Sequence, residues 1–195
     1  MFSGIITATG KVVSILAEGT NKRIEIESSI SNELKIDQSI AHDGVCLTVT
    51  KIENERYWVD VVKETLSKTT FNSLKEGQII NLEKSLTLSS LLDGHLVQGH
   101  TDTTLKCIDR RDENGSWNFT FHLPAEFAKL VIPRGSICIN GVSLTVANLL
   151  EDSLEVAIIP YTFHHTNFQH LQAGDDVNVE FDIIGKYLLR QQIPV

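Results

Sequence analysis

Two stretches decide the fold: SIAHDGVCLTVTKI at residues 39–52 and SICINGVSLTVANL at residues 136–149. Seven of their 14 aligned positions are identical, at an offset of 97 residues (136 minus 39). A second pair, TLSKTTFNSLKEGQIINLE at 65–83 and TFHHTNFQHLQAGDDVNVE at 162–180, has seven identities in 19 positions at the same offset. Separate segments that share one offset indicate an internal duplication. The identities include Gly44 and Gly141, which the apolar periodicity of ordinary strands would not explain.

A weaker match carries the repeat to its start, where SGIIT at 3–7 parallels QGHTD at 98–102. We therefore expect two domains, at 1–97 and 98–195. Each has about 95 residues, which is a usual size for a small domain.

Most segments of each half are typical of β-strands. Short runs rich in β-branched and aromatic residues, such as RIEIES at 23–28 and LEVAIIP at 154–160, alternate with turn residues. About six short strands per half favour a small closed antiparallel barrel over a parallel sheet. Weak helical signals lie at 31–36 and 124–130. A third, at about 183–192, carries an apolar stripe of Ile184, Tyr187 and Leu188, which needs a partner surface such as a neighbouring subunit.

Composition narrows the class of protein. The 195 residues are 42% hydrophobic, and the net charge of −8 argues against nucleic-acid or membrane partners. The start lacks the basic region and apolar run of a secretory signal. The cysteines Cys46, Cys107 and Cys138 form no C-x-x-C pair, so neither a disulfide framework nor a zinc site is predicted. We expect a cytoplasmic protein with reduced thiols.

Five motifs together resemble the riboflavin synthase family and its lumazine-binding repeat. They are MFSGII at 1–6, GVCLTVT at 44–50, GHLVQGHTD at 94–102, NGVSLTV at 140–146 and IPYTFHHTN at 159–167. The resemblance covers essentially the whole chain, in order and in both repeats. It implies two tandem six-stranded Greek-key β-barrels, in an all-β fold with a short C-terminal α-helix through which three chains associate.

The resemblance also implies an activity. Family members are transferases of riboflavin biosynthesis that use two molecules of 6,7-dimethyl-8-ribityllumazine. They move a four-carbon unit from one to the other, giving riboflavin and 5-amino-6-ribitylamino-uracil. No metal or organic cofactor is needed, and the site lies between barrels of different chains. A homotrimer and an association with lumazine synthase are expected on the same basis.

Such a reaction needs two pockets that are similar but not equivalent, because one substrate donates carbons and the other accepts them. The repeat alignment shows where the halves differ. Cys46 corresponds to Ser143, Ile5 to His100, and Lys63–Glu64 to Pro160–Tyr161.

Four residues are candidates for chemistry, each with a plainer alternative. His100 is the acid–base candidate, or else a structural histidine satisfied by backbone groups. Cys46 is a nucleophile or ring contact, or a strand cysteine with no chemical role. Ser143 adds to C7 of the ring or positions a water, or its hydroxyl bonds local backbone. Asp182 contacts substrate or orients a catalytic group, or it caps the last helix; both roles are compatible.

The family's binding segments map onto two predicted pockets. Thr48 and Thr145 follow Cys46 and Ser143 by two residues, so they face the same side of their strands. The first pocket is predicted from Gly4, Ile5, Ile6, Cys46, Leu47, Thr48, Asp60, Val61, Val62, Lys63, Glu64 and Thr65. The second is predicted from Gly99, His100, Thr101, Ser143, Leu144, Thr145, Ile159, Pro160, Tyr161, Thr162, Phe163 and His164.

Three further features complete the predictions. Arg134 is either a contact to the ribityl chain or a ring oxygen, or a solvated surface charge. His95, His164 and His165 lack a carboxylate or cysteine at ligand spacing, so we expect no metal site. The functional alternatives are a non-catalytic lumazine- or flavin-binding antenna protein and an oligonucleotide-binding barrel, the latter disfavoured by the negative charge.

Overall fold

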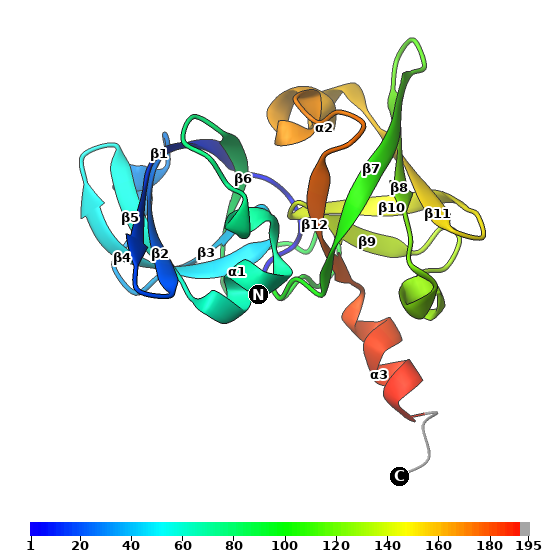
Figure 1. Cartoon of the computed structure of the whole chain (residues 1–195), viewed down its shortest axis with the longest axis horizontal. Coiled ribbons are helices and arrows are strands. Elements are labelled where there is room, and N and C mark those ends of the chain that lie inside the picture. The colour runs from blue at the N-terminus through cyan, green and yellow to red at the C-terminus, as the bar shows by residue number, and fades with distance from the viewer. Residues whose placement is uncertain (192–195) are drawn as a thin grey trace.

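The protein consists of two β-barrels side by side, with one helix projecting from the second (Figure 1). The structure is a computed structural model that describes residues 1–191. The strands of the first barrel are β1 (Ala8–Glu18), β2 (Asn21–Glu27), β3 (Ser39–His42), β4 (Val45–Glu53), β5 (Arg56–Val61) and β6 (Ile79–Lys84). Those of the second are β7 (Thr103–Asp112), β8 (Trp117–His122), β9 (Ser136–Ile139), β10 (Val142–Leu149), β11 (Ser153–Ile158) and β12 (Asp176–Phe181).

The two barrels have the same connectivity. The first closes in the order β1-β2-β5-β4-β3-β6 and the second in the order β10-β11-β8-β7-β12-β9, which is the same ring begun at a different strand and read in the opposite direction. All pairs are antiparallel, and β2 returns to lie beside β5 as in a Greek key. Even the register shifts repeat, between Val12 and Ser14 in β1 and between Cys107 and Asp109 in β7. The predicted fold of two duplicated Greek-key barrels is confirmed.

Each barrel is closed around its own apolar core, because alternate strand residues point inward. Ile24, Val49 and Val59 are fully buried in the first core, and Phe119, Phe121 and Phe168 in the second. A smaller cluster of Phe2, Ala41, Val97 and Cys138 fills the space between the barrels.

The barrels meet at two matching glycine turns. A Cβ on Gly44 would lie 2.8 Å from the backbone nitrogen of Gly141, and the reverse distance is also 2.8 Å. Both glycines have a φ of +79°, so only glycine fits the turn and the contact together. Asn81 donates to the Asn140 carbonyl at 2.9 Å, and Asn178 donates to the Asp43 carbonyl at 3.0 Å. These paired amides lock the barrels in one orientation.

Helical elements are short. α1 (Lys63–Lys68) and α2 (Pro160–His165) were not predicted from the sequence, whereas α3 (Ile183–Gln191) was. The predicted end of α3 at residue 192 lies outside the described residues. The other two helical signals form 3₁₀ turns, at Ser31–Glu33 and Ala125–Leu130.

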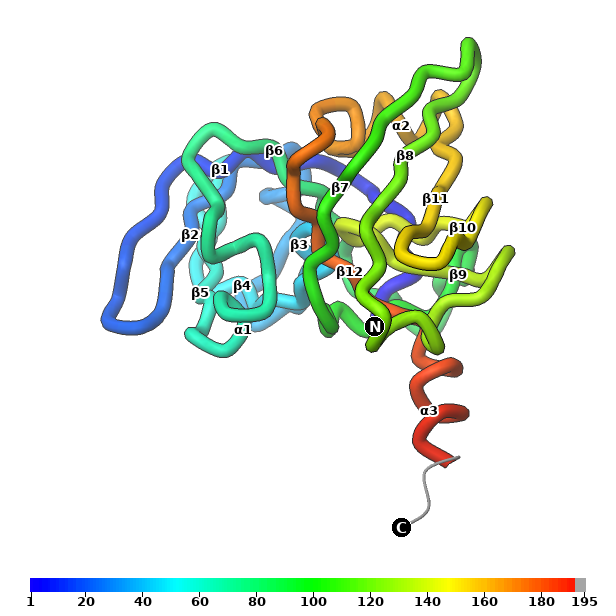
Figure 2. Tube along the Cα trace, turned by 45° about the vertical axis from the view of Figure 1, so that its right-hand side comes forward, coloured from blue at the N-terminus to red at the C-terminus, as the bar shows by residue number. Residues whose placement is uncertain are grey.

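α3 extends away from the second barrel into open space (Figure 2). Its apolar stripe of Ile184, Tyr187 and Leu188 is exposed, each side chain by more than half. None of the helices in residues 1–191 is long and apolar enough to cross a membrane.

Candidate active sites on the two barrels

The two sites begin on matching strands. In β4 the side chains of Cys46 and Thr48 point out of the barrel while Leu47 is buried within it, 7% exposed. In β10 Ser143 and Thr145 point outward in the same way. The strand alternation predicted for these pairs is therefore confirmed.

The glycine segments pair with these strands in the opposite sense to our prediction. The carbonyl of Gly4 accepts the Ser143 N–H at 2.8 Å, and that of Gly99 accepts the Cys46 N–H at 2.9 Å. A Cβ on Gly4 would lie 2.5 Å from Ser143 Cβ, and one on Gly99 would lie 2.5 Å from Cys46 Cβ. The predicted grouping of Gly4–Ile6 with Cys46, and of Gly99–Thr101 with Ser143, is wrong. Each start segment crosses to the other repeat, so both sites are built from both halves of the chain.

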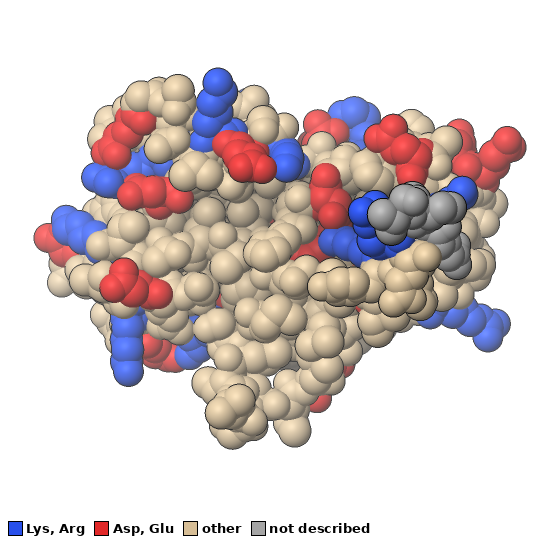
Figure 3. All heavy atoms as spheres, turned by 90° about the horizontal axis from the view of Figure 1, so that it is seen from below, with Lys and Arg blue, Asp and Glu red and all other residues tan. Residues whose placement is uncertain are grey.

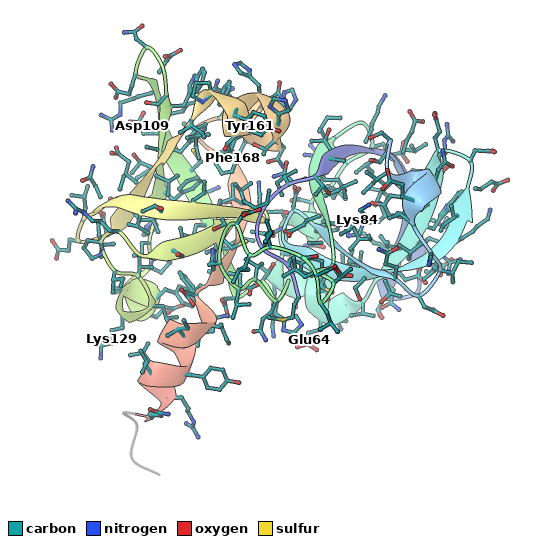
Figure 4. The ribbon with its side chains drawn as sticks, turned by 180° about the vertical axis from the view of Figure 1, so that it is seen from behind. Glu64, Lys84, Asp109, Lys129, Tyr161 and Phe168 are labelled. Carbon is teal, nitrogen blue, oxygen red and sulfur yellow. The ribbon has the colours of Figure 1, made fainter. Side chains whose placement is uncertain are left out.

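We call the group of Cys46, Thr48 and the segment 99–101 the first site, and the group of Ser143, Thr145 and the segment 4–6 the second site. α1 follows β5, which pairs with β4, and α2 follows β11, which pairs with β10. Glu64 of α1 and Tyr161 of α2 lie toward opposite edges of the molecule (Figure 4). α1 and α2 therefore lie on different sides of the chain.

The second site contains a contact that the sequence did not reveal. His95 Nδ1 lies 2.7 Å from Ser143 Oγ, and both side chains are partly buried. Burial lowers the pKa of His95, and the negative charge of Asp182 partly opposes this. A neutral imidazole bonded to a hydroxyl can accept its proton, while a nearby carboxylate favours the resulting imidazolium. His95 lies five residues before the predicted His100. Its pairing with Ser143 was overlooked because only the fold brings residues 95 and 143 together.

The other predicted catalytic residues have varied surroundings. Asp182 Oδ1 accepts the Ile184 N–H at 3.0 Å, which is the capping role given as one alternative. His100 is exposed, and its backbone N–H donates to Glu180 at 2.8 Å. Cys46 is half-buried against the small cluster between the barrels.

Some predicted binding residues are already engaged or exposed. The carboxylate of Asp60 pairs with Arg23 at 2.8 Å on the barrel surface. Arg134 is exposed at a turn, where its backbone N–H donates to the Val146 carbonyl at 2.9 Å. Val62 and Ile159, which precede α1 and α2, have apolar side chains and are 50% and 60% exposed.

The segments around α1 and α2 are supported differently. In the first barrel Asn21 Oδ1 accepts the Lys63 N–H at 3.2 Å. In the second barrel Pro160 has no N–H, and Trp117 instead stacks on Phe163, with ring centroids 3.8 Å apart. The two sites thus share a scaffold and differ in their supports as well as in Cys46 and Ser143. Among residues 1–191, no three His, Cys, Asp or Glu side chains are placed to hold a metal ion.

Comparison with known proteins agrees with this architecture. The lumazine binding domain family matches residues 3–85 and 98–182, which is one match in each barrel. The riboflavin synthase of Brucella abortus (strain 2308) is 38% identical over 197 residues, covering 97% of both chains. That of Bacillus amyloliquefaciens is 35% identical over 191 residues, covering 97% of this chain and 89% of the relative.

Solved structures show the same fold. LumP complexed with riboflavin superposes with a TM-score of 0.87 at 24% identity, and LumP complexed with 6,7-dimethyl-8-(1'-D-ribityl) lumazine with 0.85 at 23%. Both alignments cover 93% of this chain and 99% of the LumP chain. The chain therefore belongs to the riboflavin synthase family of proteins with two lumazine binding domains.

Proposed function

We propose that this protein is a riboflavin synthase, a transferase that converts two molecules of 6,7-dimethyl-8-ribityllumazine into riboflavin and 5-amino-6-ribitylamino-uracil. The observation that carries the proposal is the 2.7 Å contact between His95 and Ser143. It equips one of two similar sites with a hydroxyl beside a base, whereas the matching position of the other site has Cys46. Riboflavin synthase relatives that align over nearly the whole chain support the same reaction.

The reaction requires one substrate to lose a proton and the other to accept a nucleophile. The C7 methyl of one lumazine gives a proton to a base, for which His100 is the candidate, and the electron-poor ring delocalises the electron pair that remains. Ser143 Oγ, or a water that it positions, adds to C7 of the other lumazine while its proton passes to His95. The carbanion forms a carbon–carbon bond to the activated ring, and four carbons move to the acceptor as the uracil leaves. The oxygen that was added departs from C7 and takes its proton back from His95, and the proton removed from the methyl passes to the leaving uracil. Both reactants are the same compound, so the carbon transfer needs no external oxidant or reductant.

Positioning supplies much of the rate in such a reaction. Holding two rings in contact replaces an unfavourable encounter, which contributes up to about 7–11 kcal/mol in ideal cases. Because α1 and α2 lie on different sides of the chain (Figure 4), we propose that the first and second sites also face different sides and that two chains bring their substrates together. We propose a homotrimer on the basis of the family. The exposed apolar stripe of α3 supports association between chains, and uncharged residues fill the middle of the face that adjoins α3 (Figure 3). Cytoplasmic location and association with lumazine synthase stay predictions.

A non-catalytic lumazine- or flavin-binding protein is the second candidate, because LumP superposes over 93% of this chain. Incubation of the purified protein with 6,7-dimethyl-8-ribityllumazine separates the two. A synthase consumes two lumazines for each riboflavin and each 5-amino-6-ribitylamino-uracil formed, and Ser143→Ala lowers the rate while leaving the fold intact. Bound lumazine that stays unchanged over hours would reject the enzymatic proposal and leave the antenna.

A further inference from the structure

Two buried glutamates occupy the same place in the two repeats and have no role in the mechanism above. Glu83 in β6 and Glu180 in β12 are 97 residues apart, and each is only 3% exposed. Carboxylates are seldom buried so fully without compensating partners. Their partners are therefore informative.

Each carboxylate is bonded to the glycine segment that begins its own repeat. Glu83 Oε1 accepts from the Ser3 N–H at 2.6 Å and the Ser3 hydroxyl at 2.7 Å, and Oε2 accepts from the Gly4 N–H at 2.9 Å. Glu180 Oε1 accepts from the Gln98 N–H at 2.7 Å, and Oε2 accepts from the N–H groups of Gly99 and His100, both at 2.8 Å.

The geometry of these segments favours an anion. Consecutive backbone N–H groups around a residue with positive φ form a concave anion-binding nest. Gly4 has a φ of +77° and Gly99 a φ of +81°. Each glutamate fills its nest with a carboxylate from within the protein, through charge-assisted hydrogen bonds. Burial raises the pKa of both carboxyl groups, and the N–H groups oppose this effect.

The clamped segments are the ones that cross to the other repeat. Glu83 belongs to the first barrel and holds Gly4, which packs on Ser143 of the second barrel. Glu180 belongs to the second barrel and holds Gly99, which packs on Cys46 of the first. We infer that Glu83 and Glu180 are positioning residues that act across the chain, each ordering the substrate site on the opposite barrel. This inference rests on the proposed function only in calling these places substrate sites.

Thiol labelling tests the inference without reference to activity. Cys46 is half-buried, whereas Cys107 and Cys138 are buried and report general unfolding. In Glu180→Gln an NH₂ group replaces one acceptor and faces backbone N–H groups, so the segment at Gly99 loosens. We expect iodoacetamide to alkylate Cys46 at least about fivefold faster than in the wild type, because Gly99 no longer covers the strand. In Glu83→Gln the rate at Cys46 stays within about twofold, because its cover is intact.

The reciprocal experiment uses Ser143→Cys as a reporter in the second site. Here Glu83→Gln accelerates alkylation at position 143 and Glu180→Gln does not. Equal effects of both variants, effects confined to each glutamate's own barrel, or no effect would overturn the inference. If iodoacetamide alkylates Cys107 or Cys138 in either variant, that variant has unfolded. The experiment is then repeated with Glu83→Asp or Glu180→Asp, which keeps the negative charge on a shorter side chain.

A measurement on the unsubstituted protein guards against variants that do not fold. The amide protons of Gln98, Gly99 and His100 are expected to exchange with solvent as slowly as those of β12, since they are bonded to a buried carboxylate. Exchange at the rate of an exposed loop would contradict the clamp. If each glutamate variant accelerates alkylation on the opposite barrel but the wild type forms no riboflavin, the positioning role of the glutamates stands and the proposed function fails. If riboflavin forms and alkylation on the opposite barrel is not accelerated, only the positioning role of the glutamates is rejected.

Discussion

We predict that Asp43, at the junction of the barrels, makes the free energy of unfolding fall as the pH rises. Asp43 is 6% exposed, and its Oδ1 accepts from the Asn81 N–H at 2.7 Å and from the Asn167 side-chain N–H at 2.9 Å. Burial raises the pKa of Asp43 from 3.8 to about 8, against the smaller opposing effect of these hydrogen bonds. The second repeat has Asn140 at this position, and its Oδ1 accepts the Asn178 N–H at 2.8 Å. An asparagine therefore fits this turn.

We predict that Asp43→Asn stabilises the protein above pH 8. A carboxyl whose folded pKa is raised binds more protons in the folded than in the unfolded state, so its contribution is complete below about pH 4 and is lost as the pH rises through about 8. With pKa values of 3.8 and about 8, the loss between pH 5 and pH 8.5 is about 4 kcal/mol. The asparagine does not titrate, so the variant gains about that much relative to the wild type over the same range.

Urea unfolding followed by circular dichroism at half-unit pH steps measures this difference. Contributions from groups unchanged by the substitution cancel between the two proteins. Asn140→Asp is the matched control, and it should be destabilised relative to the wild type as the pH rises. A stability difference that does not change between pH 5 and pH 8.5 would show that Asp43 ionises without cost, and the account of its burial would be wrong.

Three other predictions follow from single contacts. Tyr57→Phe removes the hydroxyl 2.9 Å from His42 Nε2 in the first core and should cost about 1–3 kcal/mol in urea unfolding by leaving a buried nitrogen unpaired; an unchanged midpoint would contradict that bond. Gly99→Ala should lower the free energy of unfolding more than Gly77→Ala does, by about 1 kcal/mol or more. Both glycines have positive φ, but a Cβ at residue 77 meets no atom within 4 Å, so the difference measures the crowding at residue 99. Finally, His100→Ala should slow riboflavin formation at least about tenfold with an unchanged thermal midpoint; a normal rate would remove its acid–base role.

The duplication made most of the fold predictable from the sequence. Identities such as Gly44 with Gly141 and Asn81 with Asn178 fall at positions where the repeats contact each other, so one offset encodes both the barrels and their junction. The outward direction of Cys46 and Ser143 followed from strand alternation. The 3₁₀ turns and the short helices α1 and α2 were harder to assign, because segments of three to six residues carry little periodicity.

The assembly of the sites could not be predicted in the same way. Repeat alignment relates Gly4 to Gly99, but it is blind to which barrel each segment rests on, because crossed and uncrossed arrangements have the same sequence pattern. The choice depends on the reach of the chain and on where Glu83 and Glu180 present their carboxylates. The contact of His95 with Ser143 spans 48 residues and has no counterpart in the repeat pattern.

A structure with riboflavin bound tests the central claim most directly, because it shows which parts of the chain surround each ring. We predict one ring system against Cys46 and Thr48 together with segment 99–101, and another against Ser143 and Thr145 together with segment 4–6. Each ligand would then touch both repeats of a chain at once. A ligand whose contacts within one chain all come from a single repeat would contradict the account.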